Sequence, residues 1–244
     1  MPPVNNINNL SLVHVKSACD NCRVRELCLP TTLSGVELSQ LDGLVKRLPP
    51  LQKGQNLYRT GDNFKSIYAI QHGAIKTYGI TVDGREQITG FHLSGEIVGL
   101  DAIDSNQHPC NAVALEETEV CEIPFAKLES LSQKIPGLLH NISRIMSREI
   151  LREENVLMML GGASAEQRLA RFLLSLHKRL SMRQTEQADC FQLCMSRQDI
   201  SNYLGLALET VSRQLTHLHD INVINIQNRK IQILALDTLQ SLAV

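Results

Sequence analysis

The chain has 244 residues, 43% of them hydrophobic, with no tryptophan and a formal net charge of −1. This length suits one large or two medium domains with aliphatic cores. No apolar run approaches about 18 residues, and the first residues lack the pattern of a signal peptide, so neither a membrane span nor secretion is expected. The charge near zero does not by itself favour nucleic acid, although residues 161–244 are slightly basic and residues 1–160 slightly acidic. We therefore expect a cytoplasmic protein with reduced thiols.

Three cysteines, Cys19, Cys22 and Cys28, lie within ten residues near the start of the chain, after an asparagine-rich arm. Thiols so closely spaced in a reducing compartment are typical of a metal site, a cluster or a redox pair. The sequence holds four further cysteines. Three of them, Cys110, Cys190 and Cys194, have no partner in this pattern and are expected to be buried or free thiols.

Short β-like runs separated by glycine turns follow from about residue 48 to residue 125. Strands at this spacing predict a small sandwich or barrel, and Asp83-Gly84 is a good hairpin turn. The clearest runs are 66–70, 74–78, 86–91 and 120–123.

A long helix is predicted over 136–160, beginning at Pro136 and stopped by Gly161-Gly162. One stripe, Leu138, Ile142 and Ile145, suits packing on the helix's own domain. A second stripe has the 3-4-3-4-3 spacing of a coiled-coil seam and predicts a dimer interface. It consists of Ser143 followed by the five candidate interface residues Met146, Ile150, Glu153, Leu157 and Leu160. An ordinary amphipathic helix buried in a monomer remains an alternative.

The C-terminal part predicts a winged helix-turn-helix. Ser164 is a candidate N-cap for a helix over 164–180, and Ser196 with Asp199 fits a capping box. A helix over 197–204, a turn at Gly205 and a second helix over 208–219 follow. Two strands, 223–226 and 231–234, with a basic turn between them, predict a wing placed for phosphate.

The second of these helices carries the candidate DNA-reading residues. Its polar outer face consists of Glu209, Ser212, Arg213 and Thr216. Arginine bonds guanine, glutamate accepts from cytosine and serine meets bases or phosphates. A helical hairpin of another fold is the alternative, but the glycine turn, the polar face and the wing together favour DNA.

The order of these parts resembles the catabolite-activator superfamily, and closely its fumarate and nitrate reduction regulator (FNR) branch of bacterial oxygen sensors. The resemblance covers nearly the whole chain. It rests on the three spaced cysteines, the distant Cys121 and two stretches, Gln87–Leu93 and Glu209–Arg213. It implies an α+β fold with a small N-terminal β-barrel like a cyclic-nucleotide-binding jelly roll, a long dimerisation helix and a C-terminal winged helix-turn-helix. The expected parts are a cysteine-bearing cluster arm (1–30), the β-barrel sensor (31–135), the dimerisation helix (136–161) and the DNA-binding domain (162–244).

The resemblance also implies an oxygen-labile 4Fe–4S cluster on Cys19, Cys22, Cys28 and Cys121. Four thiolates also suit zinc, so the residues alone leave the metal open. Arg23, beside Cys22, is a candidate for tuning the cluster. The stretch 106–111 lacks the arginine with which cyclic-nucleotide-binding relatives hold the phosphate, so we expect no cyclic nucleotide ligand.

The function implied is an oxygen-responsive transcription regulator that acts as a homodimer on a TTGAT-type inverted repeat and controls anaerobic metabolism genes. The family's contact with RNA polymerase would fall on the turn Asp83, Gly84, Arg85 and Glu86. No nucleophile–base pair or phosphate loop supports an enzyme. A metal-free thiol regulator and a zinc-stabilised regulator of the same fold remain alternatives. We further expect Glu153, in the seam, to oppose dimerisation.

Overall fold

The computed structural model describes residues 33–182 and 189–244, together with Cys19, Cys22, Val24, Arg25, Leu27 and Cys28. The expected arm over 1–18 and the candidate Arg23 lie outside the described residues. In the described part, no helix is both long and apolar enough to cross a bilayer.

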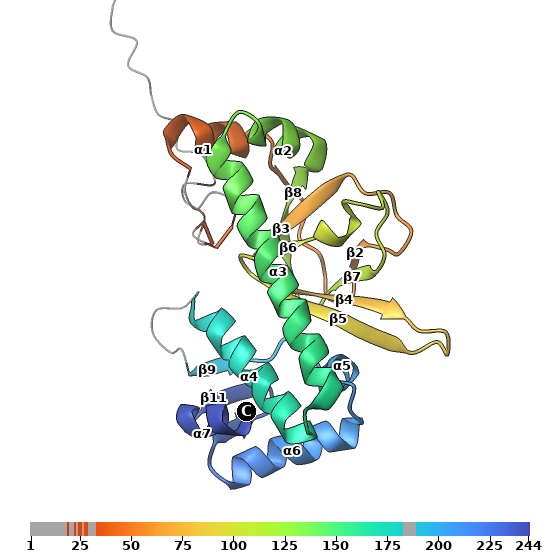
Figure 1. The fold of residues 1–244 in the computed structure, drawn as a ribbon, viewed down its shortest axis with the longest axis vertical. Helices are drawn as coiled ribbons and strands as arrows, with labels where there is room; N and C mark the ends of the chain where they lie inside the picture. The colour runs from red at the N-terminus through yellow and green to blue at the C-terminus, as the bar shows by residue number, and fades with distance from the viewer. Residues whose placement is uncertain (1–18, 20–21, 23, 26, 29–32, 183–188) are drawn as a thin grey trace, which may run out of the picture.

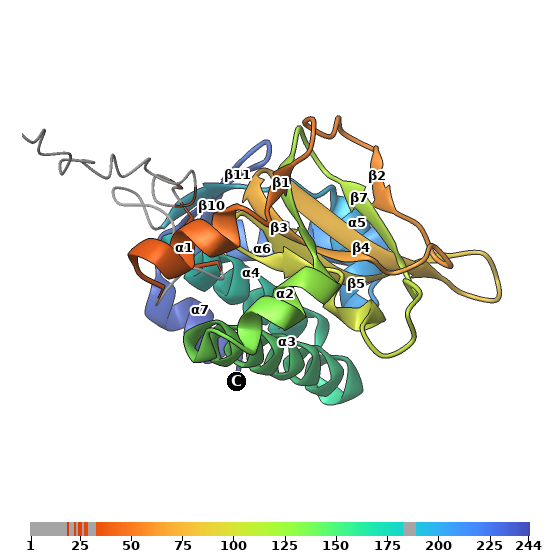
Figure 2. The ribbon, with the colours of Figure 1, turned by 90° about the horizontal axis from the view of Figure 1, so that it is seen from above.

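The first half of the chain forms a β domain of two four-stranded antiparallel sheets, each with one face in a hydrophobic core. One sheet has the order β1 (Lys46–Arg47), β8 (Glu119–Pro124), β3 (Ser66–His72), β6 (Ile97–Val98). The other has the order β2 (Asn56–Tyr58), β7 (Asn111–Ala114), β4 (Ala74–Ile80), β5 (Glu86–Leu93). Helices α1 (Gly35–Asp42) and α2 (Phe125–Ser132) flank these sheets, and the 3₁₀ turn η2 (Leu100–Ala102) follows β6 (Figure 2).

The hairpin of β4 and β5 confirms the predicted turn at Asp83-Gly84. Gly84 has a φ of +79°, a conformation that glycine adopts without a steric cost. The predicted strands at 66–70, 74–78, 86–91 and 120–123 are all present. The short strands β1, β2, β6 and β7 and the helices α1 and α2 were not predicted, because elements so short leave little periodicity in a sequence.

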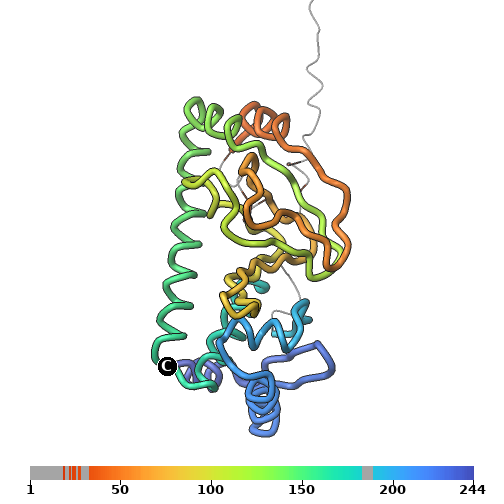
Figure 3. The backbone as a smooth tube through the Cα atoms, turned by 90° about the vertical axis from the view of Figure 1, so that its right-hand side faces the viewer, coloured from red at the N-terminus to blue at the C-terminus, as the bar shows by residue number. Residues whose placement is uncertain are grey.

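Helix α3 (Pro136–Gly162) runs the length of the molecule, from α2 to the C-terminal domain (Figures 1 and 3). Pro136 is in its first turn, as predicted. The helix continues through both glycines and ends at Ala163, so the predicted stop was slightly early. Leu138 and Ile145 are buried against the β domain, with Ile142 partly buried beside them, which confirms the predicted packing stripe.

The C-terminal domain contains the predicted helix-turn-helix and wing. Its elements are α4 (Ala165–Ser181), β9 (Cys190–Gln192), α5 (Arg197–Leu204), α6 (Leu208–Asp220), β10 (Ile224–Gln227), β11 (Lys230–Ile233) and α7 (Leu236–Leu242). Ser164 and Ser196 both form capping boxes, and Gly205 ends α5 in the left-handed region. Strand β9 adds a third, unpredicted strand to the hairpin of β10 and β11.

The two domains share one hydrophobic cluster. Phe91 of β5 lies 5.1 Å from Tyr203 of α5 and 6.0 Å from Phe172 of α4, measured between ring centroids. Centroid separations of this size are favourable for aromatic pairs. The first helix of the helix-turn-helix is therefore packed directly on the β domain, a contact that the local sequence patterns did not predict.

Candidate cysteine site and nucleic-acid interface

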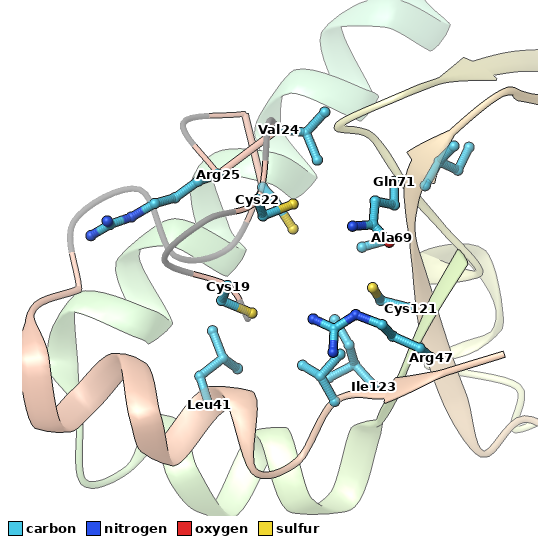
Figure 4. Close-up of a pocket in the computed structure, with 13 residues that line it drawn as sticks. Cys19, Cys22, Val24, Arg25, Leu41, Arg47, Ala69, Gln71, Cys121 and Ile123 are labelled. Carbon is cyan, nitrogen blue, oxygen red and sulfur yellow. The ribbon is translucent and has the colours of Figure 1, made fainter. Parts of the chain in front are cut away.

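The four predicted cysteine ligands line a single pocket although they come from two distant segments. Cys121 lies on β8, where β1 pairs with it through Arg47 and β3 through Ala69. Figure 4 shows the sulfur atoms of Cys19, Cys22 and Cys121 facing the same space. These thiols are far apart along the chain. They meet because the segment with Cys19, Cys22 and Cys28, called here the cysteine loop, packs beside strand β8 with Cys121.

Backbone hydrogen bonds between residues three or four positions apart shape the described part of the cysteine loop. The amide of Cys22 donates to the carbonyl of Cys19 at 3.3 Å, and the amide of Cys28 donates to the carbonyl of Val24 at 3.1 Å. The amide of Cys19 donates to Asp42 Oδ1 at 3.1 Å, which ties the start of the loop to the end of α1. These hydrogen bonds shape the described part of the loop beside the pocket that Cys121 also lines.

The pocket's other walls are mainly aliphatic. They consist of Val24, Leu41, Val45, Ala69, Ile70 and Ile123, with the polar Arg25, Arg47 and Gln71 among them. Burial raises the pKa of Cys19, and the carboxylate of Asp42 and the nearby Cys28 and Cys121 raise it further. Burial also raises the pKa of Cys121, against the opposite effect of Arg47. Thiolates gathered here therefore need a cationic centre to stabilise them.

The thiols face one pocket, yet they are not in ligating geometry. Among the described residues, no three His, Cys, Asp or Glu side chains are close enough together to hold a metal ion. The donor set of four cysteines and the aliphatic walls fit an iron–sulfur cluster.

The remaining cysteines lie elsewhere. Cys110 is buried and its thiol donates to Asp101 Oδ2 at 3.2 Å, while Cys190 and Cys194 are half-buried in the C-terminal domain. All are free thiols, as predicted.

Helix α6 presents its polar face outward. Glu209 and Arg213 are exposed and Ser212 is half-buried, whereas Val211, Leu215 and Leu218 on the opposite face are buried. The wing turn at Asn228 and Arg229 is also exposed. The faces of this helix are therefore oriented as the sequence predicted.

One residue near this surface escaped the sequence reasoning. Arg197, at the start of α5, donates from Nη1 to Ser212 Oγ at 3.4 Å and lines a pocket with Arg229 of the wing. The capping box at Ser196 could have located Arg197, because it places the next residue at the first position of the helix. Arg197 therefore lies between the outer face of α6 and Arg229 of the wing.

The predicted seam of α3 is largely uncovered in the single chain. Met146 is 39% exposed, Ile150 55% and Leu157 69%, and Glu153 is exposed among them. Leu160 is half-buried, next to Gly205 of the helix-turn-helix. An apolar stripe this long is unusual on a monomer surface.

The candidate polymerase-contact turn is an exposed hairpin tip. Asp83 accepts a hydrogen bond from Arg85 Nε at 2.5 Å, so these two side chains partner each other. Glu86 accepts from Lys76 Nζ at 3.0 Å. All four residues of the turn are exposed, and the ion pair with Lys76 holds the Glu86 side chain toward β4.

Family models match both domains. The cyclic nucleotide-binding domain matches residues 49–134 and the Crp-like helix-turn-helix domain matches residues 167–242. FixK2 from Bradyrhizobium japonicum is similar in structure, with a TM-score of 0.75 and 29% identity over 82% of this chain and 98% of that one. The fold and the helix-turn-helix define a DNA-binding transcription regulator, not an enzyme.

Comparison with known transcription regulators identifies the family to which the chain belongs. The chain is 46% identical over 225 residues to the fumarate and nitrate reduction regulatory proteins of Escherichia coli K12 and Yersinia pestis, which is 92% of this chain and 90% of each relative. The chain belongs to the fumarate and nitrate reduction regulator family.

Proposed function

We propose that this protein is an oxygen-responsive regulator in which Cys19, Cys22, Cys28 and Cys121 hold a 4Fe–4S cluster. The observation that carries the proposal is the single pocket lined by all four thiols. When bound, the cluster supplies an oxygen-labile tie between the cysteine loop and the β domain.

The exposed seam of α3 supports a homodimer as the active state. Met146, Ile150 and Leu157 would each gain at most ~1.5–3 kcal/mol on full burial. Glu153 would meet its symmetry mate, and two charges ~5 Å apart at an effective dielectric of ~20 repel by ~3 kcal/mol. With the entropy of association added, the equilibrium is near balance, so a small structural change decides it.

The dimer would present two copies of α6 to an inverted repeat of the TTGAT type. Each base contact from Glu209, Ser212 and Arg213 contributes ~1–3 kcal/mol, so one half-site is weak and two are specific. The exposed tip at Asp83, Gly84 and Arg85, with Glu86 behind it, would meet RNA polymerase. The regulator would act in the cytoplasm on genes of anaerobic metabolism.

A cyclic nucleotide is not part of this proposal. The segment between η2 and β7 holds no arginine, and its His108 is buried and stacked on Tyr58 at 3.7 Å between centroids. Glu96, in the turn just before β6, is already paired with Arg152 and Arg179. These packed side chains leave a phosphate no cationic partner there.

The test is an anaerobic absorption spectrum with iron and sulfide counts, repeated in air and paired with sedimentation. We expect a brown dimer with about four irons per chain that bleaches to a monomer in air. Cys121→Ser should abolish the colour, whereas Cys190→Ser, a half-buried thiol outside the pocket, should not. A colourless protein that contains zinc, or one that responds to oxidants through disulfides alone, would contradict the cluster and leave the DNA-binding function in place.

A further inference from the structure

Leu27, in the cysteine loop, lies directly against the turn that joins β5 to β6. Gly95 in that turn has a φ of +85°, and a Cβ placed on it would come within 2.7 Å of Leu27 Cβ. Only glycine permits so close an approach at this conformation. The loop that carries three of the cysteines is therefore in van der Waals contact with the backbone of the β domain at Gly95.

The next residue, Glu96, joins three parts of the molecule. Its carboxylate accepts a hydrogen bond from Arg179 Nε of α4 at 2.9 Å and lies 3.5 Å from Arg152 Nη2 of α3. It also accepts from the amide of Leu93 at the end of β5, at 2.9 Å. We call Glu96, Arg152 and Arg179 the Glu96 network.

The Glu96 network is shielded from solvent. The side chains of Glu96 and Arg179 are 11% and 14% exposed, and Arg179 also donates to the carbonyl of Phe91. Burial disfavours the charge on Arg179, but Glu96 outweighs this effect and raises the pKa of Arg179, so the guanidinium keeps its charge. Buried pairs of this kind act chiefly by fixing one arrangement of the elements they join, because a misplaced partner leaves an uncompensated charge.

The Glu96 network includes one residue of the dimerisation helix α3 and one of helix α4 in the C-terminal domain, the elements through which the loop would affect dimerisation and DNA binding. Arg152 precedes Glu153 of the dimer seam and also pairs with Glu149 at 2.8 Å. Arg179 lies in the last turns of α4, which packs against α6. One groove is lined by Leu27, Gly95 and all members of the Glu96 network, so no unrelated element separates them.

We propose that Leu27 and Glu96 are positioning residues that transmit the state of the cysteine loop to α3 and α4. The position of Leu27 against Gly95 sets the turn, and the turn sets the carboxylate that holds Arg152 and Arg179. This inference rests on the proposed function, since it assigns the signal to the cluster-bearing loop.

The test uses the full-length protein in cluster-loaded and apo forms, with Leu27→Ala, Glu96→Gln and the double variant. Sedimentation gives the dimer dissociation constant of each form, and the apo-to-loaded ratio measures the coupling. We expect each single variant to lower this ratio by about tenfold or more, with iron and sulfide unchanged. The double variant should lower it no further than Glu96→Gln alone, because both residues act in one path.

Lys76→Gln is the matched control. Lys76 also joins the β domain to the C-terminal domain, through Asp199, and among the described residues its ion pairs are with Glu86 of β5 and Asp199 of α5. It should loosen the domains and leave the ratio unchanged. A ratio in Glu96→Gln within about twofold of the wild type, or an equal fall in Lys76→Gln, would overturn the proposal.

A second measurement separates this inference from the cluster itself. In apo protein, hydrogen exchange is measured over residues 149–156 of α3 and 175–181 of α4. Leu27→Ala should raise exchange in both segments, as Glu96→Gln does. If the wild type holds no cluster, the proposed function fails. The exchange measured in Leu27→Ala still decides whether the cysteine loop is coupled to α3 and α4. Unchanged exchange in Leu27→Ala, with faster exchange in Glu96→Gln, would refute it.

Discussion

Lys76 of β4 donates a hydrogen bond of 2.8 Å to Asp199 of α5, so the β domain holds the first helix of the helix-turn-helix by an ion pair. The two side chains are only 13% and 15% exposed. Asp199 also accepts from the amide of Ser196 at 2.9 Å and thereby caps its own helix. One carboxylate therefore links the cap of α5 to the neighbouring domain.

Replacing Lys76 with methionine should destabilise the protein by about 1–3 kcal/mol, because Asp199 is left partly buried without its cation. The measurement is urea unfolding at pH 7. Lys53→Met, an exposed lysine in a turn of the same domain, is the control and should change little. Equal effects of the two substitutions would show that the Lys76 pair contributes nothing of its own.

The same pair predicts a pH window. Burial alone would raise the pKa of Asp199, but hydrogen bonds from Lys76 and Ser196 outweigh it and lower the pKa. Burial alone would lower the pKa of Lys76, but Asp199 and Glu86 raise it. The stabilisation is therefore complete between about pH 4 and 10 and is lost as the pH falls through the lowered pKa of Asp199. The difference in unfolding free energy between wild type and Lys76→Met should shrink below pH 4; a constant difference down to pH 2 would contradict the assignment.

His92 of β5 should make the protein sensitive to mild acid. Burial lowers the pKa of His92 to about 3. The carboxylate of Glu96 opposes this effect, and the charges of Arg152 and Arg179 add to it. In the unfolded chain the pKa of this histidine is about 6.5. Below that pH the unfolded chain binds a proton at this site and the folded chain does not, so the free energy of unfolding falls as the pH drops. At pH 5 the loss is about 2 kcal/mol. His92→Gln should remove this loss between pH 7.5 and 5, whereas His140→Gln, on the exposed face of α3, should keep it.

Removing the seam charge should shift the dimer equilibrium. Glu153→Ala is expected to dimerise and bind DNA without the cluster, because the repulsion between the two carboxylates is gone. Glu154→Ala, also exposed and next in the chain, is the control. Sedimentation and fluorescence anisotropy on apo protein measure the two effects, and a monomeric Glu153→Ala would refute the role of this residue.

Arg213→Ala should cost about 1–3 kcal/mol of DNA affinity and relax the preference at a single base pair, because we propose that its guanidinium, exposed on α6, bonds a base edge. Arg229→Ala, in the wing, should weaken binding equally for all sequences and reduce the slope of log affinity against log salt by about one. Binding to duplexes that vary at each position distinguishes these outcomes. Loss of sequence preference in Arg229→Ala and not in Arg213→Ala would reverse the two assignments.

The sequence predicted those parts of the fold that rest on local signals. Pro136, the Ser164 and Ser196 caps and the Gly205 turn each act within a few residues, and all lie where they were expected. The strand runs between residues 66 and 123 were also found, but β1, β2 and β6 are too short for their alternation to show. The two glycines in the last turn of α3 did not stop the helix where predicted, because glycine is permissive and terminates a helix only in a suitable context.

The sequence by itself determined the family, the close spacing of Cys19, Cys22 and Cys28 and the outward face of α6, since each depends on residue type and position along the chain. Only the tertiary structure decided which distant groups meet. Glu96 and Arg179 are 83 positions apart and Lys76 and Asp199 are 123 apart, and Leu27 contacts Gly95 in the turn between β5 and β6. Such contacts leave no local periodicity, because they form only when the β domain, α3 and the C-terminal domain pack together and exclude water from the charges between them.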